Sequence, residues 1–147
     1  MAENLNTIVL KAKGHHGEGV ADATIYPGEA VELASDGRYD PQTSAQAEAL
    51  KGELLIAKED ALQGKGVGDA YAQDDTLFFY IPLPGDHVQV LVASGEDIDV
   101  GDLLVVEGGG SGLFVEAAGT EAKYQLKALE DSGGALAANT LIKCRVL

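Results

Sequence analysis

Closely spaced carboxylates in residues 96–110, "EDIDVGDLLVVEGGG", are the first candidates for chemistry, because such groups bind calcium. Asp97 and Asp99 have the spacing of the first two ligands of a calcium loop. The next ligand position is Gly101, and the twelfth is Gly108 rather than a bidentate glutamate. We therefore interpret the stretch as a turn that leads into an apolar strand, and we predict no metal site there.

A second candidate is the glycine-rich stretch 62–72, "LQGKGVGDAYA". A phosphate-binding loop would need a glycine at position 59 and a hydroxyl residue after the lysine, but the chain has Glu59 and Gly66 there. A dinucleotide-binding pattern fails as well, since Asp69 stands where its last glycine is required. The sequence predicts a flexible loop and no cofactor.

Histidines near the N-terminus could ligate a metal. His15 and His16 lie close to Glu18, but adjacent side chains on an extended chain point in opposite directions, and no third strong ligand is nearby. We interpret this segment as an exposed arm.

No residue set suggests an enzyme. His87 would need a nucleophile for triad chemistry, but Ser94 and Ser111 lie in polar turns without a nucleophile elbow, and Cys144 lies in the middle of an alternating strand. Paired carboxylates such as those at 59–60 and 74–75 are most often a solvated face in so acidic a chain. We predict no catalytic residues.

Composition limits the partners and the location of the chain. Its 147 residues fit one domain, and 24 acidic against 10 basic residues give a net charge of -14, which disfavours nucleic acid as a partner. We expect no signal peptide and no membrane association, because no stretch approaches the roughly 20 apolar residues of a membrane span. A single cysteine, Cys144, excludes an intrachain disulfide and fits folding in a reducing cytoplasm.

Short runs rich in Val, Leu and Ile, separated by glycine-containing turns, predict an all-β domain. Residues 41–52, "PQTSAQAEALKG", could form one short helix or a polar loop. The nine predicted strands are residues 7–12, 30–33, 53–58, 76–81, 87–93, 103–107, 113–118, 123–129 and 140–147.

The pattern within these runs predicts which strands are covered on one face and which on both. Val88, Val90 and Val92 share one face of 87–93, and Ile142, Cys144 and Val146 share one face of 140–147, as in half-buried strands. The runs "LLVV" and "TLFFYI" do not alternate, which predicts strands covered on both faces, in the barrel interior or at a subunit interface.

The order of several segments resembles the capsid decoration (cement, or head-stabilising) proteins of tailed viruses of bacteria or archaea. The resemblance runs from Asp22 to the C-terminus. The segments that carry it are "PGEAVEL" before "SDGRYDPQ", the hairpin "YIPLPGDHVQVLVASG", the strand and turn "VGDLLVVEGGG", and the alternating terminal strand after "ALEDS".

That resemblance implies a small β-barrel or β-tulip domain, residues 21–147, that lies on the outer surface of the virion. It implies a homotrimer that binds the major capsid protein and stabilises the expanded head, with no catalytic residue. Residues 1–20 would be an extended N-terminal arm that contacts the capsid. Our predicted contact residues are Leu5, Ile8, Leu10, Lys11, Lys13, His15 and His16.

Two other functions have less support in the sequence. The turn "DIDVGDLLVVEGG" resembles that of biotinyl and lipoyl domains, sandwich-barrel binding modules that require an exposed acceptor lysine, but no lysine lies between Lys65 and Lys123. An enzyme of β-barrel type would need a positioned nucleophile or a complete metal set, and the sequence offers neither.

Overall fold

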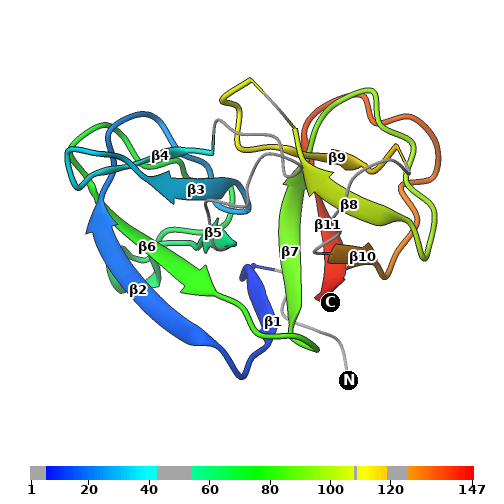
Figure 1. Ribbon diagram of the computed structural model, residues 1–147, viewed down its shortest axis with the longest axis horizontal. Helices are drawn as coiled ribbons and strands as arrows, with labels where there is room; N and C mark the ends of the chain where they lie inside the picture. Colours follow the sequence, from blue (N-terminus) through cyan, green and yellow to red (C-terminus); the bar gives the residue numbers. More distant parts are fainter. Residues whose placement is uncertain (1–5, 43–53, 108, 119–125) are drawn as a thin grey trace.

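The computed structural model describes residues 6–42, 54–107, 109–118 and 126–147, and these form strands with a single 3-10 turn, η1 (Ala61–Gln63) (Figure 1). The predicted all-β class is confirmed. The strands are β1 (Val9–Lys11), β2 (His15–Val20), β3 (Ala30–Leu33), β4 (Tyr39–Pro41), β5 (Leu55–Ala57), β6 (Thr76–Ile81), β7 (His87–Val92), β8 (Leu103–Val106), β9 (Phe114–Glu116), β10 (Leu126–Ala128) and β11 (Thr140–Val146). No helix in the described part of the chain is long and apolar enough to span a membrane.

Five strands close into a barrel in the order β7-β11-β10-β8-β9. The closure is a parallel pairing of β9 with β7, in which Phe114 lies opposite Val92. Strand β1 adds to the outer edge of β7 as a sixth strand. As predicted from their alternation, the valines of β7 and Ile142, Cys144 and Val146 of β11 point inward, while Arg145 is exposed.

The other five strands form a second sheet in the order β2-β6-β5-β3-β4, which lies beside the barrel, with β1 between the two (Figure 1). A bridge between Ala21 and Tyr39 connects the end of β2 to β4. The sequence predicted neither β2, whose residues are HHGEGV, nor β4, which is only three residues long.

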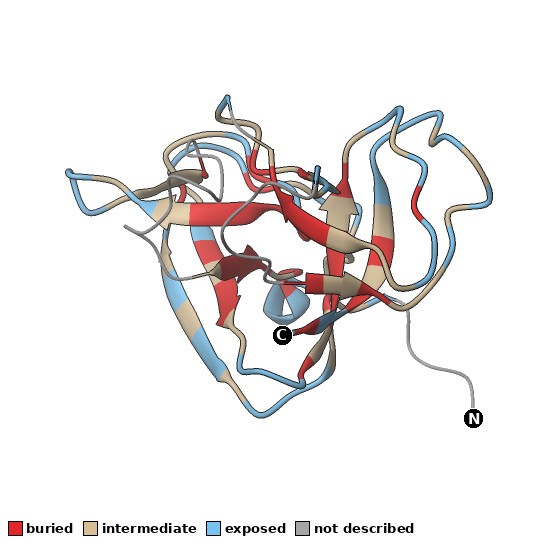
Figure 2. Ribbon diagram, turned by 45° about the vertical axis from the view of Figure 1, so that its right-hand side comes forward, coloured by how far each residue is buried: buried red, intermediate tan, exposed pale blue. Residues whose placement is uncertain are grey.

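Strand β6 separates two apolar cores. Leu77 and Phe79 pack in the core of the second sheet, whereas Tyr80 packs with the residues that fill the barrel. The prediction that a non-alternating run is covered on both faces is therefore confirmed for β6, and also for β8, where three consecutive residues are buried. Figure 2 shows buried residues along most strands and exposed residues in the connecting loops, while β2 has no buried residue.

The N-terminal segment is integrated into both sheets. The described part of the predicted arm, residues 6–20, carries β1, which pairs with β7, and β2, which pairs with β6. We therefore treat residues 6–20 as part of the folded domain rather than as an arm in front of residue 21. The alternative of a helix or loop at 41–52 lies outside the described residues, apart from Pro41 at the end of β4 and Gln42.

Candidate functional site

Two buried carboxylates fix the N-terminal segment, and the first is Glu59. Its two oxygens accept hydrogen bonds from the Thr7 hydroxyl (2.6 Å) and the Ile8 N–H (2.9 Å). Gln89 holds the same residues from the barrel side: its side-chain amide donates to the Thr7 carbonyl (2.8 Å), and its N–H donates to the Ile8 carbonyl (2.8 Å). A buried polar group needs such partners, so residues 7 and 8 connect the loop after β5 to the barrel.

Asp86 is the second carboxylate, and it lies in the turn before β7 with only 2% of its surface exposed. Its donors are the N–H groups of Lys13 (2.8 Å), Gly14 (3.2 Å) and Leu83 (2.9 Å), and the Tyr80 hydroxyl (2.5 Å). Burial acts to raise the pKa of Asp86, but these hydrogen bonds outweigh it and the pKa lies below its usual value. The anion thereby fixes the corner between β1 and β2.

The predicted contact residues divide into buried and exposed groups. Ile8 is fully buried in the core beside the barrel residues, so its side chain is not part of the surface. Leu10 is half-buried, and the exposed residues are Lys11, Lys13, His15 and His16. Leu5 lies outside the described residues. Apart from Leu5 and Ile8, the predicted set thus lies on and around one corner fixed by Asp86.

His16 forms its own contacts rather than a metal site. Its Nδ1 atom is 2.9 Å from the Lys58 ammonium, and its ring lies 5.1 Å from the Tyr80 ring. Burial first and Lys58 second lower the pKa of His16, so the ring is neutral and accepts from Lys58. Among the described residues, no three His, Cys, Asp or Glu side chains are placed to hold a metal ion.

As predicted, residues 96–102 of the acidic stretch form a turn that leads into β8. The Asp99 N–H donates to the Asp102 carboxylate (2.8 Å), the Asp102 N–H donates back to the Asp99 carbonyl (3.1 Å), and Gly101 has a φ of 98° that favours glycine. The side chains and backbone of this turn satisfy one another. In the glycine-rich stretch, Asp60 likewise caps η1 by accepting from the Gln63 N–H.

The residues weighed for triad chemistry do not face one another in the structure. Cys144 is fully buried in the barrel, and burial raises the pKa of its thiol. Ser111 donates to the Glu107 carboxylate (3.0 Å), and the N–H of Ser94 donates to Asn139 (3.0 Å). His87 opens β7 between Lys11 and an arginine of β11, so these residues assemble no nucleophile–base pair.

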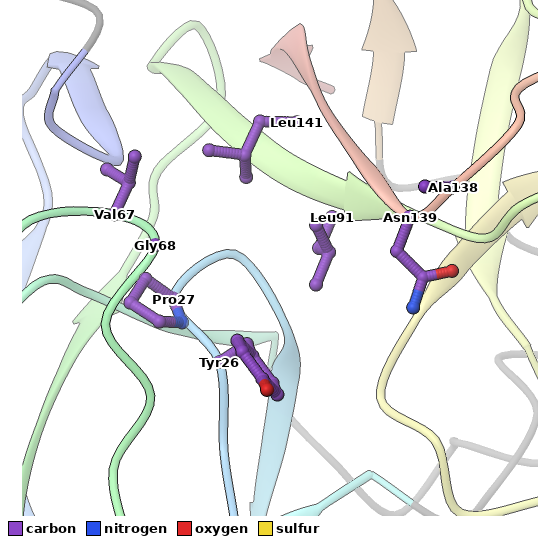
Figure 3. A pocket seen from close by; sticks show the side chains of 8 residues that line it. All are labelled: Tyr26, Pro27, Val67, Gly68, Leu91, Ala138, Asn139 and Leu141. Atoms are coloured by element: carbon purple, nitrogen blue, oxygen red, sulfur yellow. The ribbon is translucent and has the colours of Figure 1, made fainter.

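A groove of about 490 Å³ lies where the barrel meets the second sheet (Figure 3). Leu91 and Leu141 lie opposite each other on the outer face of β7 and β11 and form one wall. Gly28 permits the close approach of the opposite wall, since a Cβ atom there would lie 2.6 Å from Leu141. The lining is mainly apolar and carries no charge; it consists of Tyr26, Pro27, Val67, Gly68, Leu91, Ala138, Asn139 and Leu141.

Local sequence patterns do not indicate the residues that hold the N-terminal segment in place. Glu59 and Asp86 accept hydrogen bonds from residues of the N-terminal segment that lie 51 to 73 positions away. No local spacing in the sequence predicts these contacts. Gln89 stands at an outward position of an alternating strand, where a polar residue normally meets solvent. The only local signal is an aspartate after a Pro-Gly pair, which predicts a turn but not a hydrogen-bonded centre.

No protein-family model matches the chain, and no curated protein matches its sequence. Among solved structures, it is similar to the N base of the head fiber gp8.5 of bacteriophage phi29. The two are 13% identical with a TM-score of 0.56, over 92% of this chain and 95% of that chain. At this identity the likeness shows a shared fold, and it extends over nearly the whole of both chains.

Proposed function

We propose that this chain is a non-enzymatic structural protein of a tailed-virus head, which binds the outer surface of the major capsid protein lattice as a homotrimer and stabilises the expanded head. The observation that carries the proposal is the fold shared with a bacteriophage head-fiber base over 92% of this chain. The family resemblance of the sequence points to the same kind of protein independently of that comparison. In this proposal the chain is made in the host cytoplasm and joins the outer surface of the virion.

The proposed capsid contact is the exposed corner that Asp86 fixes. Leu10, Lys11, Lys13, His15 and His16 are the predicted contact residues whose side chains reach the surface there. Because the backbone N–H groups of Lys13 and Gly14 are bound by a buried anion, the corner is presented in one conformation, and binding costs little ordering entropy.

The test uses heads assembled without this chain, from the virus whose genome encodes it. We expect the purified protein to co-sediment with these heads at a fixed ratio and to raise the temperature at which they rupture. If the protein fails to co-sediment under any salt condition, the proposal is wrong.

The contact residues must be tested with point variants rather than with a deletion. Removing residues 1–20 would remove β1 and β2 and with them a strand from each sheet. We expect Lys13→Gln with His15→Gln to fold normally and to weaken binding to the heads, while Leu62→Gln, at a residue that is 85% exposed on η1, binds as the wild type does. If both variants bind the heads equally well, the corner is not the capsid contact.

A further inference from the structure

Four basic positions line up across four neighbouring strands of the barrel sheet. Lys11 on β1 lies opposite His87 on β7, His87 lies opposite Arg145 on β11, and Arg145 lies opposite Lys127 on β10. Residues directly opposite one another in a regular sheet have side chains on the same face, and Lys11, which follows a register shift in β1, is exposed. Since Cys144, the neighbour of Arg145, points into the barrel, this row of Lys11, His87, Arg145 and Lys127 lies on the outside.

The basic row is accessible and has no described counter-ion. Lys11 and Arg145 are exposed, and His87 and Lys127 are half-buried. In the described part of the chain, the salt bridges are those of Arg38 with Asp22 and Asp74, and none involves the row.

Such a row is unexpected in this chain. Acidic residues outnumber basic ones 24 to 10, yet segments from both ends of the sequence bring basic side chains to adjacent positions. Arg145 and Lys127 are like charges directly opposite each other, which destabilises a sheet, so this pair carries a cost in the free protein. A bound anionic group would offset that cost and would gain strong hydrogen bonds, above all from the planar guanidinium of Arg145.

We propose that the basic row binds an acidic, extended segment of a partner protein. Strands lie about 4.8 Å apart, so four adjacent strands place the row along roughly 14 Å. In an extended segment, alternate side chains lie about 6.7 Å apart, and carboxylates at three successive alternate positions span nearly the same length. The proposed function would make the partner the major capsid protein, and only that identity rests on it.

Charge favours a short acidic segment over a nucleic acid. A polyanion longer than the row would extend over the rest of a protein whose net charge is -14 and would be repelled there. A short segment of partner protein that covers the row meets much less of the acidic surface. An experiment can therefore distinguish a protein partner from a nucleic-acid partner.

The test uses a synthetic peptide with glutamates at three alternate positions and a matched peptide with glutamines, titrated into the whole protein at low salt. We expect the glutamate peptide to bind, the glutamine peptide not to bind, and added salt to weaken the interaction. Lys11→Gln with Arg145→Gln should lower the affinity roughly tenfold or more, since it removes two charge-assisted contacts. Lys58→Gln with Lys65→Gln changes the net charge equally, away from the row, and should have little effect.

The proposal is overturned if both double variants lower the affinity for the glutamate peptide equally, because the effect would then come from net charge alone. Tighter binding of an oligothymidylate than of the glutamate peptide would also overturn it. Head sedimentation distinguishes this inference from the proposed function: if wild-type protein binds the peptide through the row but does not bind heads, the capsid proposal fails and the row stands. If the protein binds heads but not the peptide, the proposal for the basic row is wrong and the capsid proposal stands.

Discussion

In the barrel, alternate valines and other apolar side chains of β7 and β11 point inward and fill the core. In the second sheet, the inner positions of β2 are Gly17 and Gly19, and aromatic rings from other strands cover them. A Cβ atom at Gly17 would lie 2.4 Å from the Phe79 ring, and one at Gly19 would lie 2.3 Å from the Tyr39 ring. The strands β7 and β11 thus supply their own core side chains, whereas the inner face of β2 is bare backbone that aromatic side chains of β6 and β4 cover.

The difference predicts unequal stability. The barrel closes on itself through β7 and β9, whereas β2 is held by pairing with β6 and by a single bridge from its end to β4. Regions with fewer apolar contacts open more readily than the closed core. We therefore expect the second sheet to open at lower free energy than the barrel.

The largest effect is expected for a matched pair of core truncations, Phe114→Ala in the barrel and Phe79→Ala in the second sheet. Each removes a buried ring and should cost about 3–5 kcal/mol. We expect Phe114→Ala to raise amide hydrogen exchange throughout the chain, and Phe79→Ala to raise it mainly in β2 to β6. Equal exchange of barrel amides in the two variants would show that both regions unfold as one unit.

Asp86→Ala tests the connection between the two regions. The substitution leaves the N–H groups of Lys13 and Leu83 and the Tyr80 hydroxyl without this acceptor, so we expect a loss of about 2–4 kcal/mol in the free energy of unfolding. Because the folded-state pKa of Asp86 is lowered, the wild type should lose this contribution as the pH falls through that pKa, whereas Asp86→Ala should not. Urea unfolding across the acidic range measures both, and an unchanged pH dependence would contradict the assignment.

A smaller effect is expected at the glycines of β2. Gly19→Ala places a methyl group against the Tyr39 ring and should cost about 1–3 kcal/mol, because the ring must move. Gly68→Ala is the control, since nothing lies within 4 Å of a Cβ atom there. Similar thermal midpoints for the two variants would mean that the aromatic cover of β2 contributes little.

The same contrast explains what the sequence predicted. All nine predicted strands are present, because each carries apolar residues of its own, and β7 and β11 show the expected faces. Strand β2 was missed because the residues that bury its inner face belong to β4 and β6, and β4 was missed because three residues ending in proline carry no strand pattern. The Asp86 and Glu59 contacts join distant segments, so they depend on the fold rather than on local spacing.

The smallest effect concerns Glu29, which lies where β3 meets the loop before β9. The Ala30 N–H donates to the Gly112 carbonyl there (2.8 Å), and Glu29 Oε2 is buried without a hydrogen-bond partner among the described residues. Burial raises the pKa of Glu29 to about 7 from an ordinary 4.5, despite a hydrogen bond from the Tyr26 N–H. The folded protein therefore binds the proton more tightly than the unfolded chain, and the stability contribution of this group falls as the pH rises from 4.5 to about 7.

Glu29→Gln isolates this contribution from the general repulsion among the acidic residues, which the variant otherwise shares with the wild type. Below the ordinary pKa, where Glu29 is protonated in both states, the two proteins should be about equally stable. At about pH 8 the variant should be more stable by on the order of 1–2 kcal/mol, because it avoids a buried, unpaired carboxylate. Urea unfolding at several pH values measures the difference, and a gap that does not change with pH would mean that Glu29 reaches solvent when it ionises. A pH-dependent gap would instead make Glu29 a weak point of the junction that the Asp86 and Glu59 contacts must offset at neutral pH.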